Sequence, residues 1–431
     1  MEGEGIAPAP ELENPLAIVA PSPGRAPRRE AWGEVLRNPR FLLLEASGAL
    51  SSAGYSIYAV TVLYLAYGLT GNLLVVGIAL FLEYGIYALT FLFAPLVDRA
   101  KDKRTILLVC FPIQAATAGL LALELARGTL TIPFLLAAVA VLAIFWDLAW
   151  AVYMIAPRLV VGKDRLFAAS GVSSALGVGT RIAGYAGGGA LVYFVGAQGG
   201  AATYAILLVL ATLVTVPLAL RGASAPDEPF WRAFVRGWAA FRGRVGRPLR
   251  QFAGLEVVYG FFAALPPLLL TEIAYERFAD PSAAYALLIV LYVLGGSAAG
   301  IVVGHFNPRR SVGLLIVLAP VLAGGATLAL LAVPTDVVLI GGLLAVVDAA
   351  ISARYEAKYA WVQAVFPPQQ LGRAVSNIYL FTGISSAVAA VSIGVVSTTI
   401  GPDGVVALVG LGFLASAGIA VAIPFVRRMR F

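Results

Sequence analysis

The sequence predicts an all-α membrane protein with twelve transmembrane helices in two six-helix bundles. Of its 431 residues, 60% are hydrophobic and only 12% are charged, about half the charged fraction of a soluble domain. The apolar residues form long runs, and a run of about 20 such residues can cross a bilayer. The first six runs are also repeated in the last six. These observations exclude a cytosolic enzyme, a disordered protein and a nucleic-acid-binding protein, despite a net charge of +7.

The chain begins with a tail, residues 1–38. The tail starts acidic, becomes rich in proline and ends basic, a composition typical of disorder. It has no apolar segment of the kind that a signal peptide needs. Six apolar runs follow within 39–220, separated by short polar or Gly/Pro segments. We predict membrane spans at 40–67, 72–97, 105–126, 131–157, 167–195 and 200–220.

The longest break between apolar runs is 221–250, which we interpret as a cytoplasmic linker. An Asp-Glu-Pro sequence at 227–229 is a helix start signal. Aromatic and apolar residues then fall on one helical face and arginines on the other, which predicts an amphipathic helix on the inner leaflet. A binding site for a partner protein has the same pattern and is the alternative.

The second half, 251–431, repeats the first. The segment 94–105 after the second span aligns with 300–311 after the eighth, which pairs Arg104 with Arg310. Duplicated halves of this kind are typical of secondary transporters. We predict the remaining spans at 251–273, 283–305, 311–333, 335–361, 372–399 and 404–426.

The basic residues predict the orientation of the chain. Of the 30 Lys and Arg, only Arg127 and Arg277 fall in loops opposite the termini, and Arg181 lies in mid-span. All the others lie on, or in the half-helix nearest, the side that carries both termini. The positive-inside rule therefore predicts a multi-pass protein of the plasma membrane with both termini cytoplasmic. Anionic lipid headgroups are the expected partners of this basic surface.

The loop between spans 2 and 3 contains Ala94, Asp98, Arg99 and Arg104 at the spacing Ala-x3-Asp-Arg-x4-Arg. This pattern resembles a loop signature of the major facilitator superfamily, with Ala94 in place of the leading glycine and Lys101 in place of the inner one. The resemblance implies a gating motif of Asp98, Arg99 and Arg104, in which Asp98 accepts hydrogen bonds from the N-terminus of span 11 near Arg373. Such a latch would hold the cytoplasmic side closed. The alternative is a loop whose charges only fix the topology.

Two further stretches extend the resemblance to about residues 38–428. Gly-Tyr-Ala-Gly-Gly at 184–188 is similar to the Gly-Pro-x-x-Gly-Gly motif of antiporters in the family, with tyrosine in place of proline. Residues 157–170 resemble the corresponding stretch of drug- and siderophore-exporting members. The resemblance implies a major facilitator fold and transport by alternating access.

Glycines in two spans predict close helix packing. Gly184 and Gly188 share a face of span 5, and Gly296 and Gly300 share a face of span 8. Small residues let helices approach closely. The resemblance implies that spans 5 and 8 touch across the two bundles, so these glycines would form the seam on which the halves rock. Static packing within one bundle is the alternative.

Four ionisable residues lie near mid-span: Glu83, Asp147, Arg181 and Asp348. A charge there costs roughly 2.5–3.5 kcal/mol on insertion scales, so each is a functional hypothesis. Asp147 and Arg181 lie at similar depth, which predicts an ion pair that serves either transport or assembly alone. Glu83 and Asp348 have no evident cation at their depth, and a buried unpaired carboxyl tends to bind a proton. We assign all four to proton coupling or substrate binding.

Further charges lie toward the cytoplasmic ends of spans. Arg354, Glu356 and Lys358 in span 10 predict a cytoplasmic gate network, and Glu45 and Glu256 favour gating or salt bridging. Aromatic residues near mid-span are candidates to line an amphipathic cavity, with lipid contact or core packing as the alternative. These are Tyr55, Tyr58, Tyr87, Trp146, Trp150, Tyr259, Phe262 and Tyr379.

The predicted function is export of an amphipathic or cationic organic compound against inward proton flow. Proton-coupled uptake or facilitated diffusion of a small metabolite is the first alternative, with Arg181 available to an anionic group. A non-transporting membrane sensor or scaffold is the second.

No catalytic group or nucleotide-binding loop is evident, so we expect neither enzyme activity nor direct ATP use. With a single cysteine, Cys110, and a single histidine, His305, we expect no metal or cofactor. We expect a monomer whose partners are a small-molecule substrate, protons and membrane lipids, and not nucleic acid.

Overall fold

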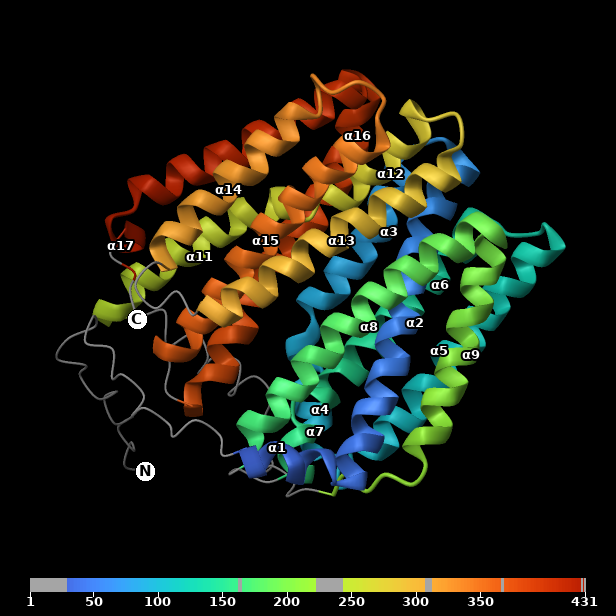
Figure 1. Cartoon of the computed structure of the whole chain (residues 1–431), viewed down its shortest axis with the longest axis vertical. Helices are drawn as coiled ribbons and strands as arrows, with labels where there is room; N and C mark the ends of the chain where they lie inside the picture. Colours follow the sequence, from blue (N-terminus) through green and yellow to red (C-terminus); the bar gives the residue numbers. More distant parts are fainter. Residues whose placement is uncertain are drawn as a thin grey trace, which may run out of the picture.

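The computed structural model describes residues 29–161, 165–221, 243–306, 312–365, 368–427 and Met429. Apart from one isolated β-bridge between Asp102 and Arg221, this part of the chain is built of helices and their connections (Figure 1). Nine of the described helical segments are long and apolar enough to cross a membrane. The protein is therefore a multi-pass, all-helical membrane protein, and the count of twelve spans stays a prediction.

The helices of the first half alternate in direction and are joined by short turns. Asn38 caps α2 by accepting hydrogen bonds from the N–H groups of Arg40 and Phe41. Gly71 ends α2 in the left-handed conformation, with φ of 59°, which glycine adopts without steric cost. The helices are α1 (Arg29–Leu36), α2 (Pro39–Thr70), α3 (Leu73–Ala88), η1 (Thr90–Leu92), α4 (Ala94–Arg99), α5 (Arg104–Arg127), α6 (Ile132–Tyr153), α7 (Ala156–Val161), α8 (Leu166–Phe194) and α9 (Ala197–Thr215).

The second predicted span, 72–97, is not one continuous helix. Its α-helical part ends at Ala88, a 3₁₀ turn follows, and α4 restarts at Ala94. Pro95 explains the interruption, because it has no N–H to donate to the Phe91 carbonyl and its ring would clash with that group in a regular helix.

The helices of the second half are α11 (Gly243–Ala263), α12 (Pro266–Arg277), α13 (Pro281–Phe306), α14 (Val312–Ala329), α15 (Val337–Val365), α16 (Pro368–Ala422) and α17 (Pro424–Arg427). Pro266 and Pro267 begin α12, where their missing N–H groups cost no helical hydrogen bond. The 55-residue α16 is interrupted at Gly401, whose φ of 69° and ψ of 176° are not helical. This glycine lies in the segment predicted to separate the last two spans.

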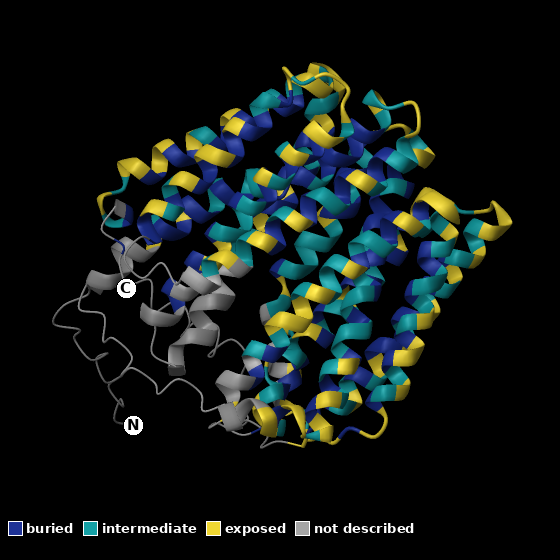
Figure 2. Cartoon of the chain, in the orientation of Figure 1, coloured by how far each residue is buried: buried dark blue, intermediate teal, exposed yellow. Residues whose placement is uncertain are grey.

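Each half packs mainly within itself. In the first half α2 lies against α8 and α9, and in the second α15 lies against α13 and α14. Between the halves, α3 packs on α16 and α8 packs on α13. Buried residues follow these contacts through the centre of the molecule, whereas exposed leucines, valines and isoleucines cover its outside (Figure 2). An apolar outer surface is what lipid contact requires.

We call the end of the molecule near α1 and α17 the inner end, and the opposite end the outer end. Toward the inner end the helices of the two halves diverge, and toward the outer end they converge (Figure 1). The distribution of Lys and Arg predicts that the inner end is cytoplasmic.

We predict that epitope tags placed at the C-terminus and at Asp227 are accessible only after the membrane is permeabilised. The physical reason is the bias of Lys and Arg to the inner side, since cytoplasmic loops hold the excess of positive charge. Antibody labelling of intact and permeabilised cells is the measurement, and a tag in the loop after Arg127 is the matched control that should label from outside. Labelling of the C-terminal tag on intact cells contradicts the predicted orientation.

Candidate functional site

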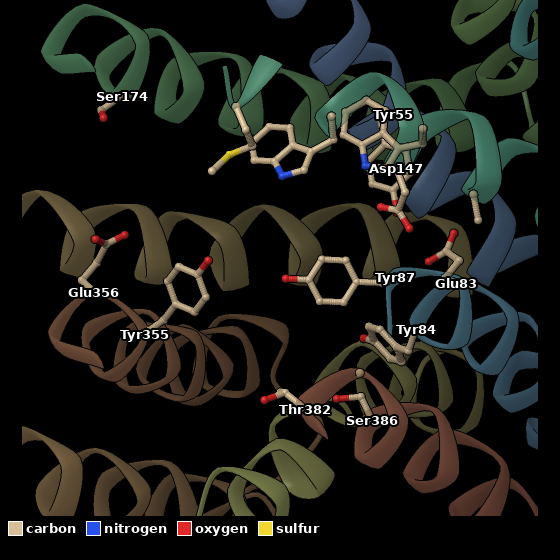
Figure 3. Close-up of a pocket in the computed structure, with 15 residues that line it drawn as sticks. Tyr55, Glu83, Tyr84, Tyr87, Asp147, Ser174, Tyr355, Glu356, Thr382 and Ser386 are labelled. Carbon is tan, nitrogen blue, oxygen red and sulfur yellow. The ribbon is translucent and has the colours of Figure 1, made fainter. Parts of the chain in front are cut away.

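A cavity of about 590 Å³ lies between the two halves. Its walls come from α2, α3, α6 and α8 of the first half and from α15 and α16 of the second (Figure 3). The lining residues are Tyr55, Glu83, Tyr84, Tyr87, Ala143, Trp146, Asp147, Trp150, Met154, Ser174, Tyr355, Glu356, Thr382, Gly383 and Ser386. A concave site shared by two halves is where a transported molecule is expected to bind.

Glu83 and Asp147 form the acidic end of this cavity. Their carboxyl groups point toward each other from α3 and α6 (Figure 3). Asp147 is 5% exposed, and no described residue forms an ion pair with either group. Glu356 adds a third carboxylate near the inner end, and none of the described lining residues is basic. The cavity is therefore suited to a positively charged guest.

Aromatic rings form one wall beside these carboxyl groups. Tyr55 stacks on Trp146, with ring centroids 4.0 Å apart and planes 11° apart. Trp146 and Trp150 lie 6.4 Å apart at 17°. Tyr87 projects into the space opposite them (Figure 3). Ring faces of this kind bind apolar groups and attract cations.

Four of the eight aromatic residues proposed from the sequence line the cavity, namely Tyr55, Tyr87, Trp146 and Trp150. Tyr58 and Tyr259 are buried in the core, and Phe262 packs against Phe413. The Tyr379 side chain lies outside the described residues.

The predicted ion pair between Asp147 and Arg181 is wrong. Arg181 Nη2 instead lies 3.2 Å from Asp348 Oδ2, with side-chain exposures of 42% and 4%. This contact joins α8 of the first half to α15 of the second. Depth along the helices suggested Asp147, but the direction of Arg181 toward the second half decides the partner. Asp348, expected to lack a cation, therefore has one.

The glycines of the predicted seam have other neighbours. A Cβ at Gly184 or Gly188 would press on α2, within the first half. A Cβ at Gly296 would meet the Asp348 carboxyl group, within the second half, and one at Gly300 would meet nothing within 4 Å. The close approach of α8 to α13 is instead at Gly189, where a Cβ would lie 2.9 Å from the Ala286 Cα.

The predicted gate network of Arg354, Glu356 and Lys358 contains Glu256 in place of Glu356. Glu256 of α11 bridges Arg354 at 2.6 Å and Lys358 at 3.0 Å, whereas Glu356 is exposed and lines the cavity. The Arg354 guanidinium also covers the Tyr259 ring, 3.6 Å from its centroid. This buried cluster ties α11 to α15 within the second half. Glu356 takes no part because it lies on the opposite face of α15.

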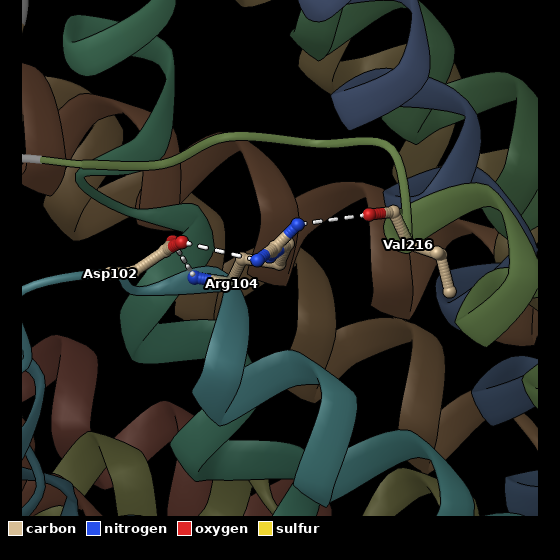
Figure 4. Close-up of polar contacts among 3 residues, drawn as sticks. All are labelled: Asp102, Arg104 and Val216. Atoms are coloured by element: carbon tan, nitrogen blue, oxygen red, sulfur yellow. Dashed lines mark hydrogen bonds and ion pairs between the residues drawn. The ribbon is translucent and has the colours of Figure 1, made fainter.

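Part of the loop motif between spans 2 and 3 has a clear structural role. Arg104 donates from Nη1 to the Val216 carbonyl at 3.0 Å, and its Nη2 lies 3.5 Å from Asp102 (Figure 4). These contacts fasten the start of α5 to the end of α9 within the first half. Arg99 is exposed. The side chains of Asp98 and Arg373 lie outside the described residues, as do the amphipathic helix predicted after Asp227 and His305.

Tyrosines close the outer end of the interface between the halves. The Tyr275 hydroxyl donates to the Tyr64 carbonyl at 2.9 Å, and Tyr285 donates to the Val60 carbonyl at 3.2 Å. The Tyr67 hydroxyl donates to Glu276 at 2.7 Å. These contacts were not predicted from the sequence, although tyrosines recur near the outer ends of spans 1, 7 and 8.

Comparison with solved structures identifies the fold. No family model and no curated protein matches the sequence. Solved structures do match. A mutant of the nucleoside transporter NupG is 15% identical, with a TM-score of 0.73 over 91% of this chain and 100% of that one. An auto-inhibited POT family peptide transporter is 14% identical, with a TM-score of 0.71 over 91% and 97%. The POT family transporter PepTSo is 10% identical, with a TM-score of 0.71 over 90% and 98%.

The chain has the same fold as these solved structures. At these identities the likeness shows the fold alone, and it covers nearly the whole length of each chain. The three neighbours are named as nucleoside and peptide transporters, and none of the three is named as a drug or siderophore exporter.

Proposed function

We propose that the protein is a secondary active transporter that carries an organic cation across the membrane by alternating access, coupled to protons. The observation that carries this proposal is the cavity between the halves, in which Glu83 and Asp147 face each other with no cationic partner among the described residues. A carboxylate that lacks a buried partner is stabilised either by a bound cation or by a proton. The same two groups can therefore alternate between substrate and proton.

The conformation supports this assignment. The cavity extends from Glu83 and Asp147 to Met154, which directly follows α6, and to Glu356 in the inner half of α15. Tyrosine contacts close the outer end. We interpret this arrangement as the inward-facing state of an alternating-access cycle. In that cycle the Arg181–Asp348 pair would have to break or re-form as the halves move, because it joins one half to the other.

Export against inward proton flow is the direction we propose, because residues 157–170 resemble a stretch of exporters and residues 184–188 resemble a motif of antiporters. Proton-coupled uptake or facilitated diffusion of a small metabolite is the second candidate, and the names of the solved neighbours favour it. An anionic substrate fits less well, because Arg181 is paired with Asp348 and the cavity lining is acidic. We further propose a plasma-membrane monomer with six-helix halves at 39–220 and 251–431, joined by 221–250.

Transport in proteoliposomes tests the function. We predict saturable, pH-gradient-driven transport of a lipophilic quaternary ammonium ion and much weaker transport of its uncharged carbon isostere, because only the cation can neutralise Glu83 or Asp147. A nucleoside and a dipeptide complete the panel, and the Glu83→Gln/Asp147→Asn double variant is the matched control. Transport of the nucleoside or dipeptide without the cation would establish the second candidate, and no transport of any solute would favour a sensor or scaffold.

A further inference from the structure

A second acidic group lies at the outer end of the interface, far along the chain from Glu83 and Asp147. Glu272 and Glu276 are one helical turn apart on α12, so their side chains share a face. Glu276 is exposed and accepts the hydrogen bond of Tyr67 from the opposite half at 2.7 Å. Glu272 is 4% exposed.

The Glu272 carboxyl group has an unsatisfied buried oxygen. Its Oε2 is buried and has no hydrogen-bond partner among the described residues, and no described residue forms an ion pair with it. Burial of a charged carboxylate in this situation is costly, whereas burial of the neutral, protonated carboxyl group costs much less. The closed outer end therefore provides a place for a proton.

The groups around Glu272 reinforce this preference. The charges that act on it are those of Glu276 and Asp403, both acidic. Arg277, the basic residue of α12, is engaged by Asp403 at 2.8 Å and by the Leu330 carbonyl at 2.9 Å. The other titratable groups on the elements packed around α12 at this end are acids and tyrosines. They are Tyr64 and Tyr67 of α2, Asp280 before α13, Tyr285 of α13 and Asp336 before α15.

Opening of the outer end changes the surroundings of Glu272. Two hydrogen bonds between α2 and α12 would have to break, Tyr67 to Glu276 and Tyr275 to the Tyr64 carbonyl. Their α12 residues, Tyr275 and Glu276, lie within about one helical turn of Glu272. Water that enters between α2 and α12 would hydrate the carboxyl group, and the ionised form would then be stable. Closure and proton binding are thereby linked at one residue.

We propose that Glu272 is a second proton-binding site, on the outer side, which must be protonated for the outer end to close. The inference rests on the proposed alternating-access function but not on the identity of the substrate. Closure of the outer end would then depend on pH through Glu272, separately from the proton binding proposed for Glu83 and Asp147.

The test measures outer closure directly. Spin labels are placed at Leu69 and Leu331, which are 45% and 41% exposed at the outer ends of α2 and α14, in a Cys110→Ala background. Inter-label distances are then recorded in lipid nanodiscs between pH 5 and pH 8. For one linked proton, the ratio of closed to open molecules changes by up to about tenfold per pH unit. We predict that acid favours the closed form in the wild type and that Glu272→Gln is closed at every pH.

Two control variants isolate Glu272 from the other groups. Tyr67→Phe removes the hydrogen bond to Glu276 and should favour the open form at every pH while it keeps the pH dependence. Glu83→Gln should also keep the pH dependence of closure.

If Glu272→Gln does not fold, Glu272→Asp should retain the pH response with a shifted midpoint. A wild-type protein without pH response, an unchanged response in Glu272→Gln, or an unchanged midpoint in Glu272→Asp overturns the proposal. A pH-responsive outer end in a protein that transports none of the tested solutes would reject the proposed substrate and leave this site intact.

Discussion

Vesicles that contain the Glu83→Gln variant are expected to exchange substrate across the membrane but to lose accumulation driven by a pH gradient. Glutamine keeps the size and hydrogen-bonding capacity of glutamate and cannot titrate. For a carrier that exchanges one proton per substrate, one pH unit corresponds to about 1.4 kcal/mol, which supports about tenfold accumulation. We therefore expect the accumulation ratio to fall from about ten to about one.

The measurement compares gradient-driven uptake with counterflow in the same vesicles, because counterflow requires binding and conformational change but no proton movement. Glu356→Gln is the matched control, since Glu356 lines the same cavity but is exposed to solvent. It should retain accumulation. Full gradient-driven transport by Glu83→Gln would remove Glu83 as the proton carrier and leave Asp147 as the next candidate, because Asp348 is paired with Arg181.

The second large effect is expected at the contact between Arg181 and Asp348. Loss of one member of a buried pair costs about 3–5 kcal/mol, and we expect less here because 42% of the Arg181 side chain is exposed. Each 1.4 kcal/mol changes a conformational ratio about tenfold. Arg181→Gln leaves the Asp348 carboxylate buried and unpaired, so it should destabilise the inward-facing state and slow transport by about tenfold or more.

A double-mutant cycle separates the pair from its surroundings. We expect Asp348→Asn to slow transport as well, and the Arg181→Gln/Asp348→Asn protein to be less impaired than the sum of the single effects, since neither charge is then left alone. Exchange of the two charges is a poor substitute, because the Asp348 carboxyl group lies directly against Gly296 and the longer arginine side chain would have to be placed differently. Glu356→Gln is the control, because it keeps the Arg181–Asp348 pair and leaves Glu83 and Asp147 in place. Purely additive effects on transport would contradict a functional contact between the halves.

The sequence predicted how deep in the membrane each charged group lies, but not which neighbouring helix its side chain faces. Asp147 and Arg181 lie at similar depth, yet Arg181 points across the interface to Asp348. Hydropathy and charge position along a span contain information on one dimension only. Which face of a helix meets which neighbour depends on tilt and rotation, and these follow from the packing of all the helices together.

The glycines and the network around Glu256 illustrate the same limit. A stripe of small residues predicts a close approach, and close approaches do occur at Gly184, Gly188 and Gly296. Their neighbours lie within the same half, because a stripe does not specify which helix fills it. Glu256 replaced Glu356 as the partner of Arg354 and Lys358 for a similar reason, since a partner from α11 is nearer in space than one from the same helix on its other face.

The sequence by itself determined that this is a helical membrane protein, because the length of an apolar run is set by the thickness of the bilayer whatever the neighbouring helices are. It also identified Glu83 and Asp147 as functional candidates, because a mid-span charge is costly in any arrangement. Only the tertiary structure decided that these two carboxyl groups face each other across one cavity, that Arg181 belongs to Asp348, and that tyrosines close the outer end. Such contacts join residues far apart in the chain, and the packing of whole helices rather than any local pattern sets which of them meet.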